Sequence, residues 1–586
     1  MPVIPWGNRA AVLGCVTLMT GKGPGSAARP QIQRRRGSDR HDMTRLFSGY
    51  PDDLSGQTAY DEMFSDPGAV RAPYDRVHEV LDGLDLSSVT GRDELMARSF
   101  LDRGVTFDYA GEERPFPLDI VPRIIPQEEW EVVERGVKQR VKALEHFLDD
   151  VYGEQRVISD GIVPRSLITS SSHFHRCVWG FQPVGGVRIH VAGIDLVRDD
   201  AGTFRVLEDN VRVPSGVSYV IENRRAMMKG LPEAFVSTPI LGVDSYPRQL
   251  LHALRSTAPE PGDDAVVVVL TPGVFNSAYF EHTLLAGLMG VELVEGRDLV
   301  VRGDRVFMRT TEGEQRVDVI YKRIDDDFTD PLQLRPDSVL GCPGLVNAAR
   351  QGNVTIANAI GNGVADDKLV YSYVPDLIRY YLDEEPILPN VDTYRLEEDE
   401  ARAYVLEHLA ELVVKPVDGS GGKGIVIGPL ASEQEIEEVR AKILEDPRGW
   451  IAQPVLQLST VPTFDGGGFS PRHVDLRPFC VNSGDDMHVL PGGLTRVAMQ
   501  KGSLIVNSSQ GGGSKDTWVV GQHRLEPAAD PETTETVADM EATAPAHGGD
   551  FDESALRRQQ EQQQQQQAAV ADDAAAVRRT TGEGKR

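Results

Sequence analysis

The sequence has few cysteines and no long apolar run, and each absence excludes a class of protein. The four cysteines of the 586 residues lie too far apart for a zinc-binding spacing or a small disulfide framework: Cys15, Cys177, Cys342 and Cys480. No apolar stretch approaches the length of a membrane span. The short apolar patch over residues 10–19 is interrupted by polar and glycine residues and makes a poor signal peptide. We therefore expect a cytoplasmic protein with no membrane partner.

Basic residues are also in the minority. The chain has 61 Lys and Arg against 89 Asp and Glu, which gives a formal net charge of -28. Nucleic-acid-binding proteins present clustered Lys and Arg, so this balance argues against a nucleic-acid partner. A content of 40% hydrophobic and 26% charged residues is typical of a soluble globular protein.

Both ends of the chain differ from its middle. Residues 1–42 are rich in Gly, Pro and Arg, which predicts a disordered leader or a misassigned start with Met43 as the true initiator. Residues 527–586 are rich in Ala, Thr, Glu and Gln and include the run Gln562 to Gln567, so we expect a disordered tail. The catalytic region is expected at 60–525.

The middle of the chain alternates helix and strand patterns. A helical stripe of apolar residues runs from Trp130 to Val151. A strand at 265–270, a helix at 276–289 and a strand at 291–294 form a Rossmann-like βαβ unit within a subdomain at about 240–345. The fold class is therefore α/β, of mixed α+β type, with part of the protein built on a parallel sheet.

A glycine-rich turn joins two short apolar runs between Leu412 and Gly428, which predicts a hairpin. Its G-x-G-x-x-G spacing is followed by a strand and not by a helix, so it is no dinucleotide fingerprint. Lys423 is followed by Gly424 and not by Ser or Thr, so it is no Walker A loop either. A flap of backbone amides over a triphosphate remains, with Lys415 on the strand beneath it. The alternative is a plain surface hairpin.

A second hairpin is predicted between Val187 and Val211. A turn of two or four residues places Asp195 on the same face as Glu208 and Asn210. Two carboxylates and an amide oxygen suit Mg²⁺, which prefers oxygen ligands and often takes phosphate oxygens as well. The alternative is a solvated hairpin face.

The two hairpins together resemble a known family. Asp195 with Glu208-x-Asn210 and Pro214-Ser215-Gly216 resembles the magnesium strand pair of ATP-grasp enzymes. Val414-Lys415-Pro416 and Asp367-Lys368 resemble their two nucleotide lysines. In an ordinary ATP-grasp chain the magnesium segment comes after the lysines, whereas here it comes before them. The order resembles the circularly permuted ATP-grasp type 2 proteins, which are related to the glutathionylspermidine synthase fold. Permutation is tolerated where chain ends lie close together.

The resemblance implies a role for individual residues. The magnesium segment spans about 160–220 and the nucleotide segment about 355–520, with Asp195, Glu208 and Asn210 as metal ligands. The nucleotide contacts implied by the resemblance are Lys368, Lys415, Gly419, Ser420, Gly421, Gly422, Gly424, Gln453 and Val455. Many relatives have Glu at the position of Gln453. The residues implied to act on the transferred phosphate or to close the site are Arg477, Arg496 and Asn507. Each arginine is equally explained as an ordinary strand residue, and Asn507 as part of a linker.

Substrate contacts are less well defined by the sequence. Arg323 and Asp325 follow a strand and are candidates to hold an amino acid or amine, with Ser215 as a further candidate. The aspartates of this segment equally suit the cap of the next turn.

The resemblance implies a reaction. ATP-grasp enzymes activate a carboxylate as an acylphosphate, which an amine or thiol then attacks, with ATP and Mg²⁺ as cofactors and Mn²⁺ as an alternative metal. The expected partners are small-molecule or peptide carboxylates and amines. A phosphotransferase that uses the same ATP grip and a nucleotide-binding pseudoenzyme are the alternatives, and the oligomeric state is open.

The two ends are expected to be dispensable, because neither has the apolar surface to join a core. A chain shortened to Met43–Gln522 should melt at the temperature of the full-length protein in a calorimetric scan. A melting temperature lower by many degrees would show that one of the ends packs on the core.

Overall fold

The structure is a computed structural model that describes residues 46–47, 49–54, 58–66, 69–109, 112–417, 424–504, 506, 511–521 and 562. All of these belong to one compact unit, Thr44–Arg586. The leader, the tip of the glycine flap at 418–423 and Asn507 lie outside the described residues. Within the described residues the fold is of mixed α/β type, as the sequence predicts.

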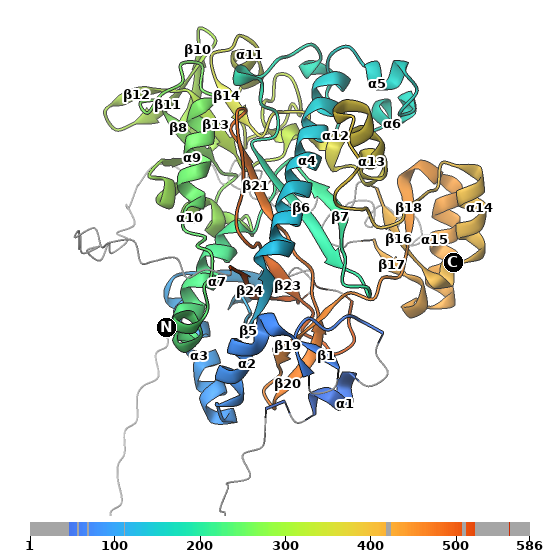
Figure 1. Cartoon of the computed structure of the whole chain (residues 1–586). Coiled ribbons are helices and arrows are strands. Elements are labelled where there is room, and N and C mark those ends of the chain that lie inside the picture. The colour runs from blue at the N-terminus through green and yellow to red at the C-terminus, as the bar shows by residue number, and fades with distance from the viewer. Residues whose placement is uncertain are drawn as a thin grey trace, which may run out of the picture. The chain divides into compact units, whose positions relative to one another are not determined.

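A parallel sheet carries the expected βαβ unit. Its strand order is β14 (Thr355–Ala357), β13 (Val319–Lys322), β8 (Val267–Leu270) and β9 (Glu292–Val294). Helix α10 (Tyr279–Met289) connects β8 to β9, which pair in parallel, and this confirms the βαβ unit. The four residues of β8 are all buried, as expected of a strand covered on both faces. This sheet lies at the upper left of Figure 1.

An antiparallel sheet carries the predicted metal ligands. Its order is β22 (Met487–Val489), β21 (Phe479–Asn482), β6 (Val191–Arg198) and β7 (Phe204–Asn210). Strand β21 pairs with β6 through Phe479 and Gly193. A strand from the C-terminal part of the chain thereby lies beside the hairpin β6–β7 (Figure 1).

The turn between β6 and β7 is longer than the sequence suggests. Arg198 pairs with Phe204, so residues 199–203 form a five-residue turn, and the expectation of two or four residues is wrong. Asp199 stabilises this wider turn by accepting hydrogen bonds from the backbone of Ala201 (3.1 Å) and Thr203 (2.8 Å). A bulge then shifts the register, and Asp195 lies directly opposite Glu208.

Helix α4 (Gln127–Val151) buries the predicted apolar stripe and is joined to β7 by a buried ion pair. Its Arg140 donates to both oxygens of Asp209, with Nε at 2.5 Å and Nη2 at 2.8 Å. Both side chains are essentially fully buried. Because neighbours along a strand point to opposite faces, this pair holds β7 with Glu208 and Asn210 turned the other way.

The glycine-rich hairpin forms part of a small four-stranded sheet. The order is β15 (Tyr394–Arg395), β18 (Trp450–Pro454), β16 (Leu412–Pro416) and β17 (Val426–Ile427). Strands β16 and β17 pair antiparallel, as predicted. Helices α14 (Asp399–Glu407) and α15 (Glu433–Glu445) cover this sheet around a separate apolar core. Helix α13 (Lys368–Leu382) begins beside it, where the backbone N–H of Lys368 donates to Val417 (3.1 Å).

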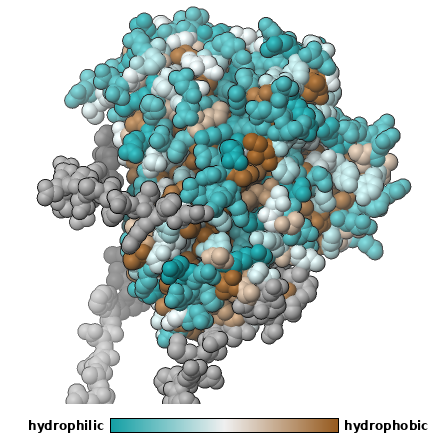
Figure 2. Space-filling model, viewed as in Figure 1, coloured by the Kyte–Doolittle hydropathy of each residue, from teal (hydrophilic) through white to brown (hydrophobic). Residues whose placement is uncertain are grey.

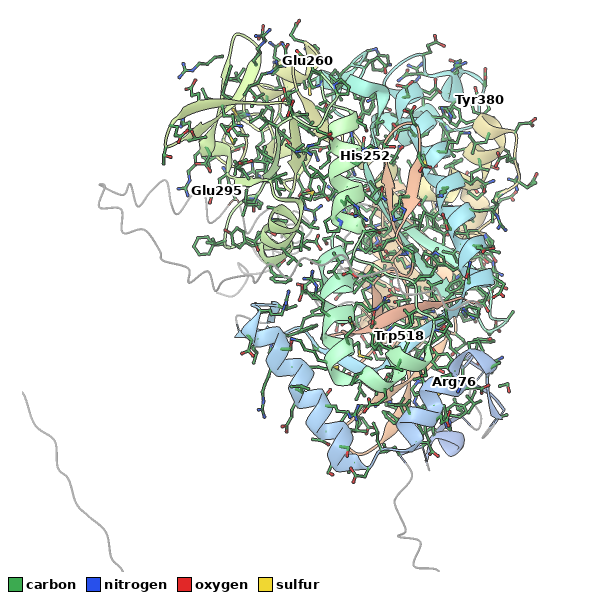
Figure 3. The ribbon with its side chains drawn as sticks, turned by 60° about the vertical axis from the view of Figure 1, so that its left-hand side comes forward. Arg76, His252, Glu260, Glu295, Tyr380 and Trp518 are labelled. Atoms are coloured by element: carbon green, nitrogen blue, oxygen red, sulfur yellow. The ribbon has the colours of Figure 1, made fainter. Side chains whose placement is uncertain are left out.

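A fourth sheet contains the last strand of the described residues. Strand β24 (Gly513–Val520) lies between β5 (Leu118–Pro126), which is parallel to it, and β23 (Thr495–Val497), which is antiparallel. Trp518 of β24 is fully buried, its indole N–H donates to Asp516 (2.6 Å), and it is labelled in Figure 3. Strand β23 is the element that carries Arg496.

Smaller elements complete the fold. The remaining strands are β1 (Phe64–Asp66), β2 (Ala69–Val70), β3 (Thr106–Tyr109), β4 (Glu112–Pro115), β10 (Leu299–Arg302), β11 (Arg305–Thr310), β12 (Gly313–Val317), β19 (Thr460–Phe464) and β20 (Phe469–His473). The remaining helices are α1 (Tyr50–Leu54), α2 (Asp75–Asp82), α3 (Leu86–Asp102), α5 (Arg156–Ser159), α6 (Arg165–Thr169), α7 (Val217–Gly230), α8 (Pro232–Ser237), α9 (Tyr246–Ser256), α11 (Leu345–Arg350) and α12 (Gly363–Asp366).

One face of the molecule is mainly polar. Hydrophilic residues cover most of the face shown in Figure 2, with hydrophobic residues scattered between them. Among the described residues, no helix combines the length and the apolar character that crossing a membrane requires. Cys342 and Cys480 are buried and Cys177 is half-buried, all three as free thiols, while Cys15 lies outside the described residues.

One residue of the C-terminal segment has a described contact. The side chain of Gln562 is buried, accepts from the backbone of Val339 (2.7 Å) and donates to the carbonyl of Asp337. The chain shortened to Met43–Gln522 lacks this contact. The expectation that the tail does not pack on the core takes no account of it.

The Arg140–Asp209 pair gives a prediction about stability. Asp209→Ala should lower the free energy of unfolding by about 3–5 kcal/mol, because it leaves a buried guanidinium without its partner. Chemical denaturation measures this change. Glu208→Gln, one residue away on the other face, is the control and should change the unfolding free energy far less. Equal losses for the two variants would contradict the role given to the pair.

Candidate functional site

Three side chains that are far apart in the sequence lie together. The ammonium of Lys368, at the start of α13, is 3.5 Å from a carboxylate oxygen of Glu208 on β7. Lys415 on β16 interacts electrostatically with both Glu208 and Lys368. The predicted metal hairpin and the predicted nucleotide lysines therefore face the same place.

Burial of the Lys415 ammonium disfavours its charged form. The protein around its ammonium lowers the pKa of Lys415 to about 8, although the carboxylates of Glu208 and Asp195 act in the opposite direction. Its Nζ donates to the side-chain oxygen of Gln453 on β18 at 2.6 Å. A desolvated ammonium with a neutral hydrogen-bond partner is well suited to an incoming anion.

Gln453 is buried, and its side-chain amide is hydrogen-bonded within the protein. Its amide nitrogen donates to the hydroxyl of Thr393 (2.9 Å), while its oxygen accepts from Lys415. Both ends of the amide are thus engaged within the protein, and Gln453 positions Lys415.

Asp195 is enclosed by two arginines. Arg477 donates to both of its oxygens, to Oδ2 at 2.7 Å, and Arg496 donates to Oδ2 at 2.6 Å. Burial alone would raise the pKa of Asp195, but the two guanidiniums outweigh it and hold the pKa well below the ordinary range. Asp195 is therefore a permanent anion at the base of the site.

The two arginines differ in what else they contact. Arg496 also binds Asp475, which is buried and accepts its Nε at 3.0 Å. Arg477 instead has its Nη2 3.8 Å from Glu208 and donates from Nη1 to the carbonyl of Ser215 at 3.3 Å. Of the two, Arg477 lies nearer to the group formed by Glu208 and Lys368.

The oxygen donors fit Mg²⁺ in part. Asn210 follows Glu208 by two residues on the same strand face, and its amide is 3.5 Å from Asp195. Among the described residues, no group of three or more His, Cys, Asp or Glu side chains is arranged to hold a metal. Glu208, with 27% of its side chain exposed, and Asn210 would supply oxygen ligands, and the rest would come from phosphate and water. Asp195 already accepts several N–H groups, so it would need to exchange an arginine for the metal.

The three substrate candidates make contacts of their own within the protein. Arg323 is buried and binds Glu281 (3.0 Å), the carbonyl of Pro214 (2.8 Å) and the hydroxyl of Tyr321 (3.2 Å). Through Pro214 it supports the loop of Ser215, which is half-buried. Asp325 instead pairs with Arg212 at 3.7 Å and makes no side-chain cap of the next turn.

Some residues of the site were not found from the sequence. Arg212 lies two residues after the end of β7 and contacts Asp366 (3.3 Å), and burial raises the pKa of Asp366 to about 6. Asp367 caps α13 by accepting from Leu369 (2.9 Å) and binds Arg448 (2.6 Å). In the sequence, the sign that Arg212 and Asp367 belong to the site is their closeness to Asn210 and Lys368.

The remaining nucleotide candidates are placed only in part. Gly424 has a positive φ of 73° at the end of the flap, which favours glycine there. Val455 follows β18 and is half-buried. Gly419, Ser420, Gly421, Gly422 and Asn507 lie outside the described residues.

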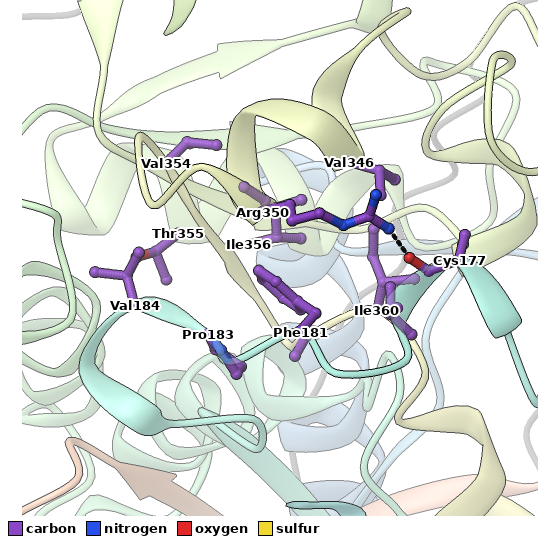
Figure 4. A pocket seen from close by; sticks show the side chains of 13 residues that line it. Cys177, Phe181, Pro183, Val184, Val346, Arg350, Val354, Thr355, Ile356 and Ile360 are labelled. Carbon is purple, nitrogen blue, oxygen red and sulfur yellow. Dashed lines mark hydrogen bonds between the residues drawn. The ribbon is translucent and has the colours of Figure 1, made fainter. Parts of the chain in front are cut away.

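A surface pocket lies elsewhere. It is lined mostly by apolar side chains, among them Phe181, Val346 and Ile360. Figure 4 shows Arg350 at its side, where it donates to the carbonyl of Cys177. None of its lining residues belongs to the group around Glu208 and Lys415.

Comparison with known proteins identifies the family of the chain. The family model described as circularly permuted ATP-grasp type 2 matches residues 122–498. The chain belongs to this family. The match includes the β6–β7 hairpin, both lysines and both arginines, and it confirms the resemblance drawn from the motifs.

Two related proteins match this chain over more residues than the family model does. A protein of Mycobacterium leprae is 58% identical over 517 residues, which are 88% of this chain and 92% of the relative. A protein of Frankia casuarinae with the name "Putative glutamate--cysteine ligase 2-2" is 46% identical over 79% of this chain. The chain spans 54% of the length of that relative.

A solved structure agrees on the fold. A glutathione synthetase-like effector from Globodera pallida, in its apo form, superposes with a TM-score of 0.50 over 75% of this chain and 98% of that one. The two sequences are 11% identical, so the likeness concerns the fold alone.

The electrostatics of Lys415 give a prediction. Its amine should become half-neutral near pH 8, and Glu208→Gln should move this midpoint lower, because Glu208 raises the pKa of Lys415. The pH dependence of acylation at Lys415, followed by mass spectrometry, measures the midpoint. The control is Glu260→Gln. Glu260 lies at the outside of the molecule and is labelled in Figure 3. An unchanged midpoint in Glu208→Gln would show that the two groups do not interact.

Proposed function

We propose that the protein is an ATP-dependent carboxylate–amine ligase that acts through an acylphosphate. The proposal depends on one observation: Glu208 lies close to Lys368 and Lys415, so that one anion adjoins two cations from separate elements. Membership of an ATP-grasp family and the name of the Frankia casuarinae relative, 46% identical, support the same reaction class.

Different residues would contact different groups of the bound nucleotide. Lys368 and Lys415 would neutralise phosphate oxygens of ATP, and the backbone of the flap at 418–423 would cover them. Mg²⁺, held by Glu208 and Asn210, would supply further neutralisation of the β- and γ-phosphates when bound. Arg477, 3.8 Å from Glu208, is the arginine best placed to contact the transferred phosphate.

The reaction needs no nucleophile from the protein. A carboxylate of the substrate attacks the γ-phosphorus, ADP leaves, and an amine or thiol then displaces phosphate from the acylphosphate. Cys342 and Cys480 support this view, because burial raises the pKa of their thiols to about 11 and about 12.

Hydroxylamine trapping tests the proposal. The protein is incubated with ATP, Mg²⁺, hydroxylamine and a panel of amino and dicarboxylic acids that includes L-glutamate. A hydroxamate formed together with ADP would support the ligase. A phosphorylated hydroxyl product from a metabolite extract would support a phosphotransferase instead. No turnover despite tight nucleotide binding would support a pseudoenzyme.

Two substitutions should separate binding from turnover. Lys415→Met should weaken ATP binding by at least about tenfold without unfolding the protein, because Met keeps the apolar stem and removes the charge. Glu208→Gln should retain ATP binding but lose most turnover and most Mg²⁺ dependence, because the amide keeps the shape without the charge. Calorimetry and ADP release measure the two effects. Unchanged ATP affinity in Lys415→Met would remove Lys415 from the nucleotide site.

A further inference from the structure

A cluster of carboxylates lies at the carboxyl end of β13. Asp325, Asp326 and Asp327 follow the strand in sequence, and Asp366 joins them from the end of α12. The side chain of Asp326 is buried, whereas that of Asp327 is 62% exposed. The cluster therefore reaches from the protein interior to solvent.

This acidic cluster adjoins the candidate phosphate site. Asp366 accepts hydrogen bonds from the backbone of Val211 (2.6 Å) and Arg212 (3.1 Å), directly beyond the strand that carries Glu208 and Asn210. The guanidinium of Arg212 lies 3.3 Å from Asp366 and 3.7 Å from Asp325. Asp366 also interacts electrostatically with Glu208.

The charges of the cluster do not balance. Lys322 is 2.7 Å from Asp326, and both are buried. Arg212 is shared between Asp325 and Asp366. Four carboxylates thus have two permanent cations, and Asp327 has a histidine as its neighbour. Excess negative charge beside a site for polyphosphate is unfavourable unless a cation binds between them.

A buried imidazole points at the same carboxylates. His175 is 8% exposed, and its Nε2 has no hydrogen-bond partner. This nitrogen lies 3.9 Å from both Asp326 and Asp327. The backbone of His175 is fixed by a hydrogen bond to the hydroxyl of Tyr152 (3.3 Å). An unengaged imidazole nitrogen held beside carboxylates is a suitable proton acceptor.

We propose that this cluster binds the amine substrate of the ligase as an alkylammonium ion. Asp325 and Asp327 are its anionic contacts, and His175 is the base that removes its proton. This inference rests on the proposed function, and it assigns a positively charged amine to the acceptor position.

The chemical step balances. One proton passes from the ammonium to Nε2 of His175, and the neutral amine attacks the carbonyl carbon of the acylphosphate. The C–N bond forms as the C–O bond to phosphate breaks, and phosphate leaves with the electron pair. The second proton on nitrogen leaves with the phosphate as hydrogen phosphate.

Binding of a simple amine tests the assignment. The full chain is labelled with ¹⁵N-histidine, and the resonance of His175, identified by its loss in His175→Gln, is followed during titration with n-butylamine. The resonance should shift in a saturable way, and Asp325→Asn/Asp327→Asn should raise the dissociation constant at least about tenfold. Titration with n-butanol, which lacks the charge, should give no saturable shift.

A matched variant controls for net charge. Asp82→Asn/Asp102→Asn changes two exposed aspartates at the ends of α2 and α3 and should bind n-butylamine as the unaltered protein does. No saturable shift with n-butylamine, or equal affinity in the cluster and control variants, would overturn the assignment.

Kinetics distinguish this inference from the proposed function. Hydroxylamine is mainly uncharged at mildly alkaline pH, so no base has to remove a proton before it attacks. His175→Gln should therefore leave the rate of hydroxamate formation nearly intact. The same variant should slow n-butylamide formation at least about tenfold. Equal loss of both products would overturn the role of His175 as base. Failure of every carboxylate to give hydroxamate would count against the ligase itself, while the binding titration would still decide the amine site.

Discussion

The buried network around Asp195 is the interaction on which the candidate site depends. Asp195 lies between Arg477 and Arg496, and Arg496 lies between Asp195 and Asp475. Two anions and two cations satisfy one another in the interior, where an unpaired charge would be costly. The network fixes the β6–β7 hairpin against the C-terminal strands. Glu208 and Asn210 can then face outward from a rigid base.

This network also explains how a permuted chain order builds the same site. Asp195 and Arg477 are 282 residues apart, and Asp195 and Arg496 are 301 apart. Sheet pairing between β21 and β6 brings these segments together, and Lys368 approaches Glu208 from a third segment. Each element keeps its neighbours in space, so the order in which the chain visits them changes without loss of the site.

The sequence predicted those features that depend on local pattern. The stripe of α4, the βαβ unit and the two hairpins follow from spacing and from glycine, and the family motifs pointed to Asp195, Glu208, Lys368 and Lys415 as candidates. The five-residue turn escaped prediction because its length is compensated by a bulge, which leaves no mark in the alternation of strand residues. His175 and Arg212 escaped because they lie in loops, where spacing carries no information about direction. The burial of Arg323 at its strand end depends on Glu281 of α10, 42 residues earlier, a contact that no local pattern predicts.

The charges at the two parts of the site complement the proposed reactants. Around the lysines, Lys368, Lys415, Arg477 and Arg496 face Asp195, Glu208 and Asp475, and Lys415 has a neutral amide as its hydrogen-bond partner. An anion is therefore the ligand that would relieve the desolvation of Lys415. Across Arg212 the balance reverses, and carboxylates outnumber cations. A polyphosphate on one side and an ammonium on the other would each be bound where the opposite charge is in excess. The carboxylate that joins them would be activated at the boundary, close to Glu208.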